Sequence, residues 1–149
     1  MSGEHVQQIH NNGGEEMNKR VYWFLSLTWG SIMSLIGLIA LGIMRVQGHK
    51  VKHHKNALYM TVGHNWGGVN LGCVFFVDNE NEHEFCKNHE YGHSIQNIIY
   101  GPLMPFIVSL PSLIRATYRT ILEKFGKKFE TEYYDIWFES QANYLGGKF

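Results

Sequence analysis

The run from Tyr22 to Met44 contains 23 residues without a charged side chain, and it limits what this chain can fold into more than any other feature. About 20 apolar residues cross a bilayer as one α-helix, because every backbone amide is then satisfied within the helix. Trp23 and Trp29 lie toward its N-terminal end, where interfacial aromatic residues are common. The stretch is longer than the apolar part of a usual signal peptide. We therefore expect a transmembrane helix over residues 21–45.

Basic residues flank both ends of this stretch and predict its orientation. Two cations precede it and four follow it: Lys19 and Arg20, then Arg45, Lys50, Lys52 and Lys55. The positive-inside rule places the side with more cations in the cytoplasm, so the C-terminal part is expected there. If the protein is bacterial, the membrane is the inner membrane. Residues 46–57 then form a basic juxtamembrane linker, held against anionic headgroups or simply solvated. Residues 1–20 are polar and predict a disordered tail.

Length and composition restrict the remaining possibilities. The 149 residues suit one domain, which we place at residues 58–149. Thirteen basic and thirteen acidic residues cancel, so charge gives no reason to expect nucleic acid as a partner. Two cysteines, Cys73 and Cys86, are too few to define a disulfide framework, and we interpret them as small buried hydrophobic residues.

The domain is expected to belong to the α+β class. Residues 58–62 and 69–77 are rich in β-branched and aromatic side chains and flank a glycine-rich turn, which predicts a β-hairpin or short antiparallel sheet. Helices are expected over residues 85–100, 112–125 and 137–145. Gly101 and Pro102 end the first of these helices, because glycine permits a left-handed cap and proline has no amide to donate.

All three prolines of the chain fall within the apolar segment 102–114. This segment is too short to span a bilayer and too interrupted to be a regular helix. It is either an interfacial or re-entrant segment or a buried connector, and we favour membrane contact. The helix that follows it is amphipathic and basic, which suits a surface that faces headgroups or an ordinary solvated face.

The pentapeptide His89-Glu90-Tyr91-Gly92-His93 is an H-E-x-x-H pattern. On a helix, His89 and His93 project from one face a single turn apart, where two imidazoles can hold one zinc ion. Glu90 can then reach a water on the open side of the metal and act as general base. Gly92 lies between the two ligands and would allow another segment to approach the helix closely.

Glu139 is the candidate third ligand, since a catalytic zinc takes three protein ligands and keeps one open position. It lies on the helix expected over residues 137–145, and an exposed carboxylate is the alternative interpretation. Asn143 follows one turn later and could hydrogen-bond a ligating side chain and fix its orientation. His64 stands alone in a glycine-rich turn, and we exclude it from the metal site.

These residues resemble the zincin metallopeptidases, and within them the gluzincins, whose third ligand is a glutamate on a downstream helix. The E-x-x-A-N pattern of Glu139 to Asn143 is similar to the E-x-x-A-D of CAAX prenyl proteases and their bacterial heat-shock relatives, with Asn in place of Asp. H-E-Y-G-H-S-I-Q together with E-x-x-A-N also resembles small bacterial membrane-associated proteins over residues 59–149. The resemblance implies a sheet edge beside the metal where an extended substrate adds as a strand, for which Val69 to Phe76 is the candidate.

The function expected from these features is a membrane-anchored zinc metallopeptidase that acts on peptide or protein substrates. Tyr133 or Tyr134 could supply a hydrogen-bond donor for the oxyanion, and the sequence does not select between them. A membrane-anchored scaffold with a structural metal is the alternative. Glu90 discriminates between the two functions, because it would have no necessary role in a structural site. In a third interpretation the histidines pack in a core and the chain is a small anchored adaptor.

Overall fold

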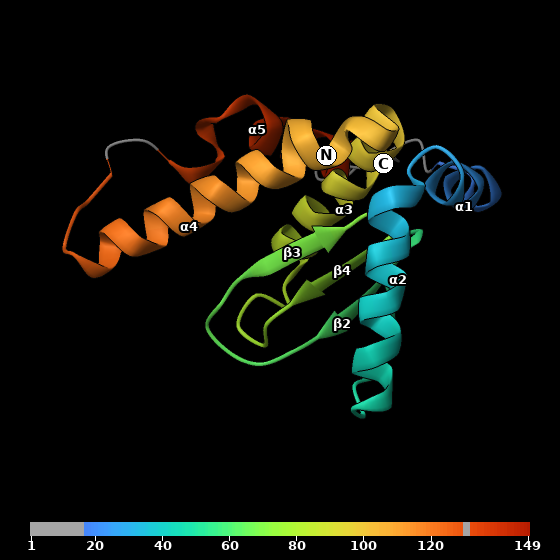
Figure 1. Ribbon diagram of the computed structural model, residues 1–149, viewed down its shortest axis with the longest axis horizontal. Coiled ribbons are helices and arrows are strands. Elements are labelled where there is room, and N and C mark those ends of the chain that lie inside the picture. The colour runs from blue at the N-terminus through green and yellow to red at the C-terminus, as the bar shows by residue number, and fades with distance from the viewer. Residues whose placement is uncertain (1–16, 130–131) are drawn as a thin grey trace, which may run out of the picture.

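The computed structural model describes residues 17–129 and 132–149. Within these residues, five α-helices and a four-stranded sheet form a mixed α+β domain (Figure 1), as the sequence predicted. The disordered tail predicted for residues 1–20 lies outside the described residues up to residue 16, and α1 already begins at Lys19.

The single helix expected over residues 21–45 is wrong, because two helices share this stretch. Helix α1 covers Lys19–Leu27 and α2 covers Ser31–Val46, and they meet at 98°. The bend follows from packing at Gly30, whose carbonyl accepts a hydrogen bond of 3.0 Å from the Asn97 amide. A Cβ on Gly30 would lie 2.4 Å from that amide nitrogen, so only glycine permits this contact.

Among residues 17–129 and 132–149, no single helix combines the length and the apolar character that crossing a bilayer requires. Two bent pairs meet the requirement jointly by length and composition. One is α1 with α2, and the other joins Glu84–Leu103 to Pro105–Lys124 across a bend of 116°. The transmembrane part of the expected fold is therefore unsupported.

The sheet is mixed, and its order is β1-β2-β4-β3. Its strands are β1 (Lys52–His54), β2 (Ala57–Thr61), β3 (Gly68–Leu71) and β4 (Val74–Val77). The predicted antiparallel pairing of 58–62 with 69–77 is wrong, since β2 runs parallel to β4 and the 69–77 run is itself a hairpin of β3 and β4. Gly72, with φ +73°, makes that turn, and its amide donates to the Asn70 side chain.

The predicted helix over 85–100 is confirmed as α3, Glu84–Tyr100, which ends at Gly101 with φ +53°. It packs antiparallel against α5, Trp137–Lys148, which confirms the C-terminal helix. The two backbones touch at glycines of each helix. A Cβ on Gly92 would lie 1.8 Å from the carbonyl oxygen of Ala142, and a Cβ on Gly146 would lie 1.8 Å from that of Asn88. The close approach expected at Gly92 is thus made by α5.

The proline-containing segment is irregular, as predicted. It forms a 3-10 turn η1 (Gly101–Leu103), a π-helical turn η2 (Pro105–Ser109) and the start of α4 (Leu110–Lys124). A further 3-10 turn, η3 (Tyr133–Asp135), leads into α5. Helix α4 extends away from the sheet (Figure 1) and contains no buried residue.

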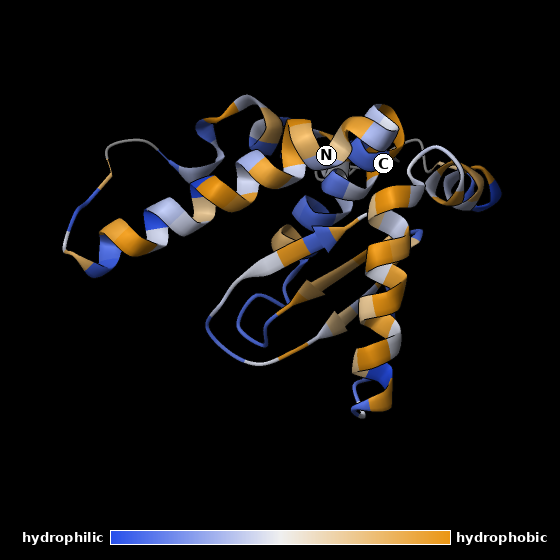
Figure 2. Cartoon of the chain, viewed as in Figure 1, coloured by the Kyte–Doolittle hydropathy of each residue, from blue (hydrophilic) through white to orange (hydrophobic). Residues whose placement is uncertain are grey.

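The main core lies between the sheet, α3 and the N-terminal helices. Strand β4 is buried along its whole length, which is why its sequence shows no alternation of polar and apolar residues. Tyr22 of α1 is fully buried in this core and stacks on Tyr91 of α3 at 5.9 Å. The N-terminal helices therefore pack into the domain, while the outer side of α2 stays apolar along its length (Figure 2).

Candidate metal centre

Three predicted ligands meet where α3 crosses α5. The ligand atoms of His89, His93 and Glu139 all lie within 4.8 Å of one another. Oε2 of Glu139 is 3.1 Å from Nε2 of His89 and 3.3 Å from Nε2 of His93, and the two Nε2 atoms are 3.2 Å apart. All three side chains are buried, with Glu139 at 0% exposure. Folding therefore brings together residues that lie far apart in the chain.

Amide side chains hold both imidazoles with their Nε2 atoms toward the centre. Nδ1 of His89 lies 2.8 Å from Oδ1 of Asn143, and Nδ1 of His93 lies 2.7 Å from Oε1 of Gln96. Because an amide oxygen only accepts, each Nδ1 carries a proton, so that in a neutral ring Nε2 presents a lone pair. The ligand that Asn143 contacts is His89.

When both rings are neutral, three acceptor atoms face one another. Oε2 of Glu139 is buried and has no hydrogen-bond partner among the described residues. Protonating both Nε2 atoms would place two imidazolium charges 3.2 Å apart, which is strongly unfavourable in a buried site. A bound cation satisfies all three acceptors at once. The donor set of two nitrogens and one carboxylate oxygen therefore fits a metal ion.

The other oxygen of Glu139 is held from α4 and η3. Oε1 accepts a hydrogen bond from the hydroxyl of Ser112, and the hydroxyl of Tyr133 lies 3.3 Å away. Arg115 in turn donates to the carbonyl oxygen of Tyr133. These contacts orient the carboxylate so that Oε2 points at the imidazoles. Helix α4, which buries no residue, is thereby tied to the centre by a polar contact.

Glu90 lies beside the ligands without joining them. Its side chain is 5% exposed, and its Oε2 atom has no hydrogen-bond partner in the described part of the chain. Burial, with a further contribution from the charge of Glu139, raises the pKa of Glu90 to about 7 against the opposing effect of His89. Gly68 of β3 makes room for it, because a Cβ there would lie 2.5 Å from Oε1 of Glu90.

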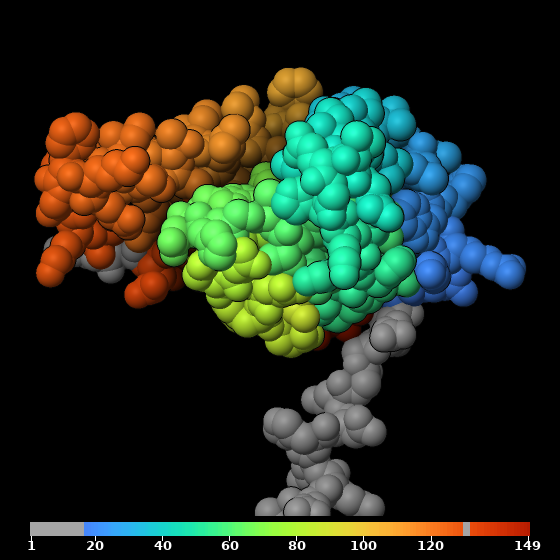
Figure 3. Space-filling model, turned by 90° about the horizontal axis from the view of Figure 1, so that it is seen from below, coloured from blue at the N-terminus to red at the C-terminus, as the bar shows by residue number. Residues whose placement is uncertain are grey.

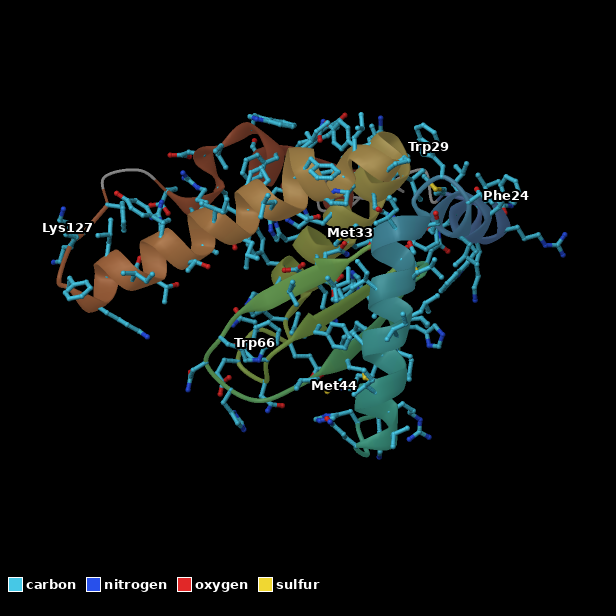
Figure 4. The ribbon with its side chains drawn as sticks, viewed as in Figure 1. Phe24, Trp29, Met33, Met44, Trp66 and Lys127 are labelled. Carbon is cyan, nitrogen blue, oxygen red and sulfur yellow. The ribbon has the colours of Figure 1, made fainter. Side chains whose placement is uncertain are left out.

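A cleft of about 1020 Å³ leads to this centre. His89, Glu90 and His93 lie on one wall of it, β3 forms another, and α4 with η2 faces them. Met33 and Trp66 line the cleft and lie toward opposite ends of β3 (Figure 4). The cleft is thus long enough to hold an extended chain along the strand.

Two residues that orient the ligand side chains were not predicted from the sequence. Gln96 orients His93 and also donates from Nε2 to the carbonyl oxygen of Phe138 at 2.7 Å, directly before Glu139. Its spacing of three residues from His93 on one helix was a usable signal. Ser112 gave no such signal, because its helix is joined to Glu139 only by tertiary packing.

Of the remaining candidate residues, the two tyrosines line the cleft and His64 does not. Tyr133 and Tyr134 both line the cleft, and the Tyr134 ring lies 5.0 Å from that of His89. His64 lies outside the metal group and pairs with Glu80 at 2.8 Å, in agreement with its exclusion. Cys73 and Cys86 are both buried and free, as interpreted from the sequence.

Comparison with known proteins gives no match: no family model, no curated protein and no solved structure aligns significantly with this chain. The likeness to gluzincins therefore rests on the motif residues alone. What the structure adds is that these residues converge on one buried group able to hold a metal ion.

Proposed function

We propose that this protein is a zinc-dependent metallopeptidase that hydrolyses peptide bonds. The observation that carries the proposal is Glu90, a buried carboxylate with an unpartnered oxygen that lies in the cleft beside a three-ligand centre. A site that only stores a metal has no need of such a group. Two imidazoles and one carboxylate form a ligand set that suits zinc.

In this proposal His89, His93 and Glu139 hold the zinc ion. When bound, the ion supplies a Lewis acid for the scissile carbonyl and lowers the pKa of water toward about 7. Glu90 takes a proton from the attacking water and returns it to the leaving amine. Because Glu90 is buried, its carboxyl group has a proton affinity that suits both steps near neutral pH.

The substrate would lie extended along β3. This strand is at the edge of the sheet, so an added chain can pair with its free backbone groups. Gly68 brings that edge directly against Glu90. The edge predicted from the sequence was Val69 to Phe76. In this proposal the substrate pairs with β3, Gly68–Leu71, alone, because β4 is an internal strand.

Tyr134 is the better candidate for the oxyanion donor. The hydroxyl of Tyr133 is already directed at Glu139, which commits it to the ligand. Tyr134 lines the same cleft beside His89. Replacing Tyr134 with Phe should therefore lower kcat by about 10²-fold without loss of zinc, whereas Tyr133→Phe should weaken zinc binding.

A structural metal is the second candidate function, and one observation favours it. The three ligands come from two helices in backbone contact, so an ion there would also cross-link α3 to α5. In that case the chain would be a metal-stabilised scaffold, and hydrolysis would be absent.

Metal content per chain, measured by mass spectrometry on purified full-length protein, tests the centre first. We expect one zinc per chain in the wild type and less than about a tenth of that in His89→Ala and Glu139→Ala. A folded wild-type protein that takes up no zinc would contradict the proposal.

Peptidase activity then separates the two candidates. Glu90→Gln should keep its zinc and lose activity by about 10²-fold to 10⁴-fold. Glu84→Gln, an exposed carboxylate on the same helix, is the matched control and should retain wild-type activity. Hydrolysis that survives in zinc-loaded Glu90→Gln would exclude the mechanism, and a zinc-bound wild type without hydrolysis would favour the scaffold.

A further inference from the structure

Helix α2 carries an apolar stripe that nothing in the described residues covers. Its members are 45–89% exposed and recur at helical spacing: Ile32, Leu35, Ile36, Ile39, Ile43 and Val46. The opposite side of the helix packs on the sheet, where a Cβ on Gly37 would lie 2.1 Å from the carbonyl oxygen of Leu71. The helix is therefore fixed, and its aliphatic side faces outward.

Helix α4 carries a second exposed apolar stripe. Ile114, Tyr118 and Phe125 are 59–80% exposed outside the cleft, and Leu110, Leu113 and Ile121, 49–60% exposed, continue the stripe to the cleft that they line. Figure 1 shows α2 in front of the sheet and α4 beside it, and Figure 3 shows both helices along one edge of the molecule with the strands on the other side. The two helices therefore lie along the same side of the molecule.

The turn between α1 and α2 packs directly against the bend that follows α3. A Cβ on Gly101, at the end of α3, would lie 2.2 Å from the indole nitrogen of Trp29, in the turn between α1 and α2. Asn97 also donates to the carbonyl oxygen of Gly30 and to the hydroxyl of Ser34. The stripes are thus held in one orientation relative to each other, as a preformed surface.

The charge around this surface is mainly positive. Residues 17–77 and 91–122 contain no Asp or Glu. The same segments contribute the cations Lys19, Arg20, Arg45, Lys50, Arg115 and Arg119. Helix α2 contains no acidic residue and α4 contains only Glu123, which lines the cleft. An apolar surface on helices that carry more cations than acidic residues fits anionic lipid headgroups over an apolar interior.

The shape of the two helix pairs argues against a span. Helix α2 has 16 residues and is about 24 Å long, shorter than the roughly 30 Å hydrocarbon core, and the 98° bend turns α1 away from its axis. A protein partner would suit the α2 stripe poorly, because its six aliphatic residues offer no hydrogen bond or aromatic anchor. We infer that α2 and α4 dock this protein in the plane of one leaflet of an anionic bilayer.

Flotation of the full-length protein with vesicles tests the surface. With vesicles of phosphatidylcholine and phosphatidylglycerol we expect most of the protein to float, and at least tenfold less with phosphatidylcholine alone. Ile36→Glu and Ile114→Glu should each reduce binding to the anionic vesicles by tenfold or more. Phe85→Glu changes an exposed apolar residue outside both stripes and should bind as the wild type does.

Two outcomes of flotation would overturn the inference: no flotation with anionic vesicles, or equal loss in Phe85→Glu and the stripe variants. Circular dichroism of each variant establishes that it is folded. The inference is independent of the metal centre, so His89→Ala should float as the wild type does.

Labelling distinguishes docking from a span. Lys19→Cys and Gln47→Cys place a thiol on either side of the apolar stretch, while the native Cys73 and Cys86 are buried. In sealed membrane vesicles from expressing cells, an impermeant maleimide should label both positions or neither, according to vesicle orientation. Labelling of one position with protection of the other until detergent is added would show a span and overturn in-plane docking.

Discussion

Helices α2 and α3 have nearly the same length, 16 and 17 residues, and opposite relations between composition and burial. Helix α2 is almost wholly apolar, yet only Met33, Ser34 and Gly37 are buried in it. Helix α3 carries two histidines, two glutamates and several amides, yet it is buried from His89 to Ile98. Figure 2 shows the contrast in hydropathy. Burial in this protein follows the available partners more than hydropathy.

Hydrogen bonds explain how α3 tolerates its burial. Asn97 donates to Gly30, Ser94 accepts from Asn70, and both ligand histidines meet amide oxygens. Burying such groups unpaired costs several kcal/mol in total, roughly 1–3 kcal/mol for each. The buried side-chain atoms of α3 without a partner are Oε2 of Glu90 and Oδ1 of Asn97, and the former lies at the proposed reaction centre.

The largest difference in stability is expected between two Gly→Ala variants, one in α3 and one in α2. Gly92→Ala places a Cβ against the carbonyl oxygen of Ala142, so α3 and α5 must separate. We expect a loss of more than about 3 kcal/mol in unfolding free energy, together with loss of bound zinc. Gly42→Ala in α2 meets open space and should be neutral or stabilise by up to about 1 kcal/mol. Chemical denaturation of both variants measures the difference, and equal effects would refute the packing argument.

Gln96 tests whether the buried amides of α3 serve the ligands. Gln96→Met keeps the volume but removes the acceptor for His93 and the donor to Phe138. Zinc affinity, measured by competition with a chelator, should fall by about 10-fold to 100-fold. Gln47→Met, beyond the end of α2, is the control and should leave the affinity unchanged. An unaltered affinity in Gln96→Met would mean that packing alone orients His93.

Asp78 extends the comparison to a buried charge outside the helices. Its carboxylate accepts hydrogen bonds from the amides of Trp66, Gly67 and Asn81, and these outweigh its burial and lower its pKa to about 2. Because the folded pKa lies below the unfolded value of about 3.9, the carboxylate stabilises the fold above pH 4. This contribution is lost as the pH falls toward 2.

Asp78→Asn should therefore lower the unfolding free energy by about 1–2 kcal/mol at pH 7. Denaturation at several pH values should show a smaller loss of stability between pH 4 and pH 2 in the variant than in the wild type. Identical slopes would place the acid sensitivity of the fold elsewhere.

The smallest effect on folding is expected on the exposed side of α2. Ile39 is 64% exposed, so Ile39→Gln removes little buried area and should change the unfolding free energy by less than about 0.5 kcal/mol. Thermal denaturation in the absence of lipid measures this. A loss of 2 kcal/mol or more would show that the stripe is covered in solution, for example by another copy of the chain.

Local signals determined much of the candidate site. The spacing of His89 and His93 and the cap at Gly101 are properties of one helix, so they could be inferred from residues close together in the chain. Glu139 and Asn143 were found because a three-ligand metal site requires a further carboxylate and a helix places the two a turn apart. The α+β class and the approximate bounds of α3, α4 and α5 followed in the same way.

Only the tertiary structure decided the bend, the sheet order and the outer contacts of the ligands. An uncharged run predicts a helix, but it does not reveal that Asn97, far along the chain, closes on Gly30 and breaks that helix in two. The parallel pairing of β2 with β4 and the contact of Ser112 with Glu139 likewise join distant segments. Hydropathy and spacing report on neighbours in the chain, whereas these features depend on which surfaces pack together, and packing is a property of the whole fold.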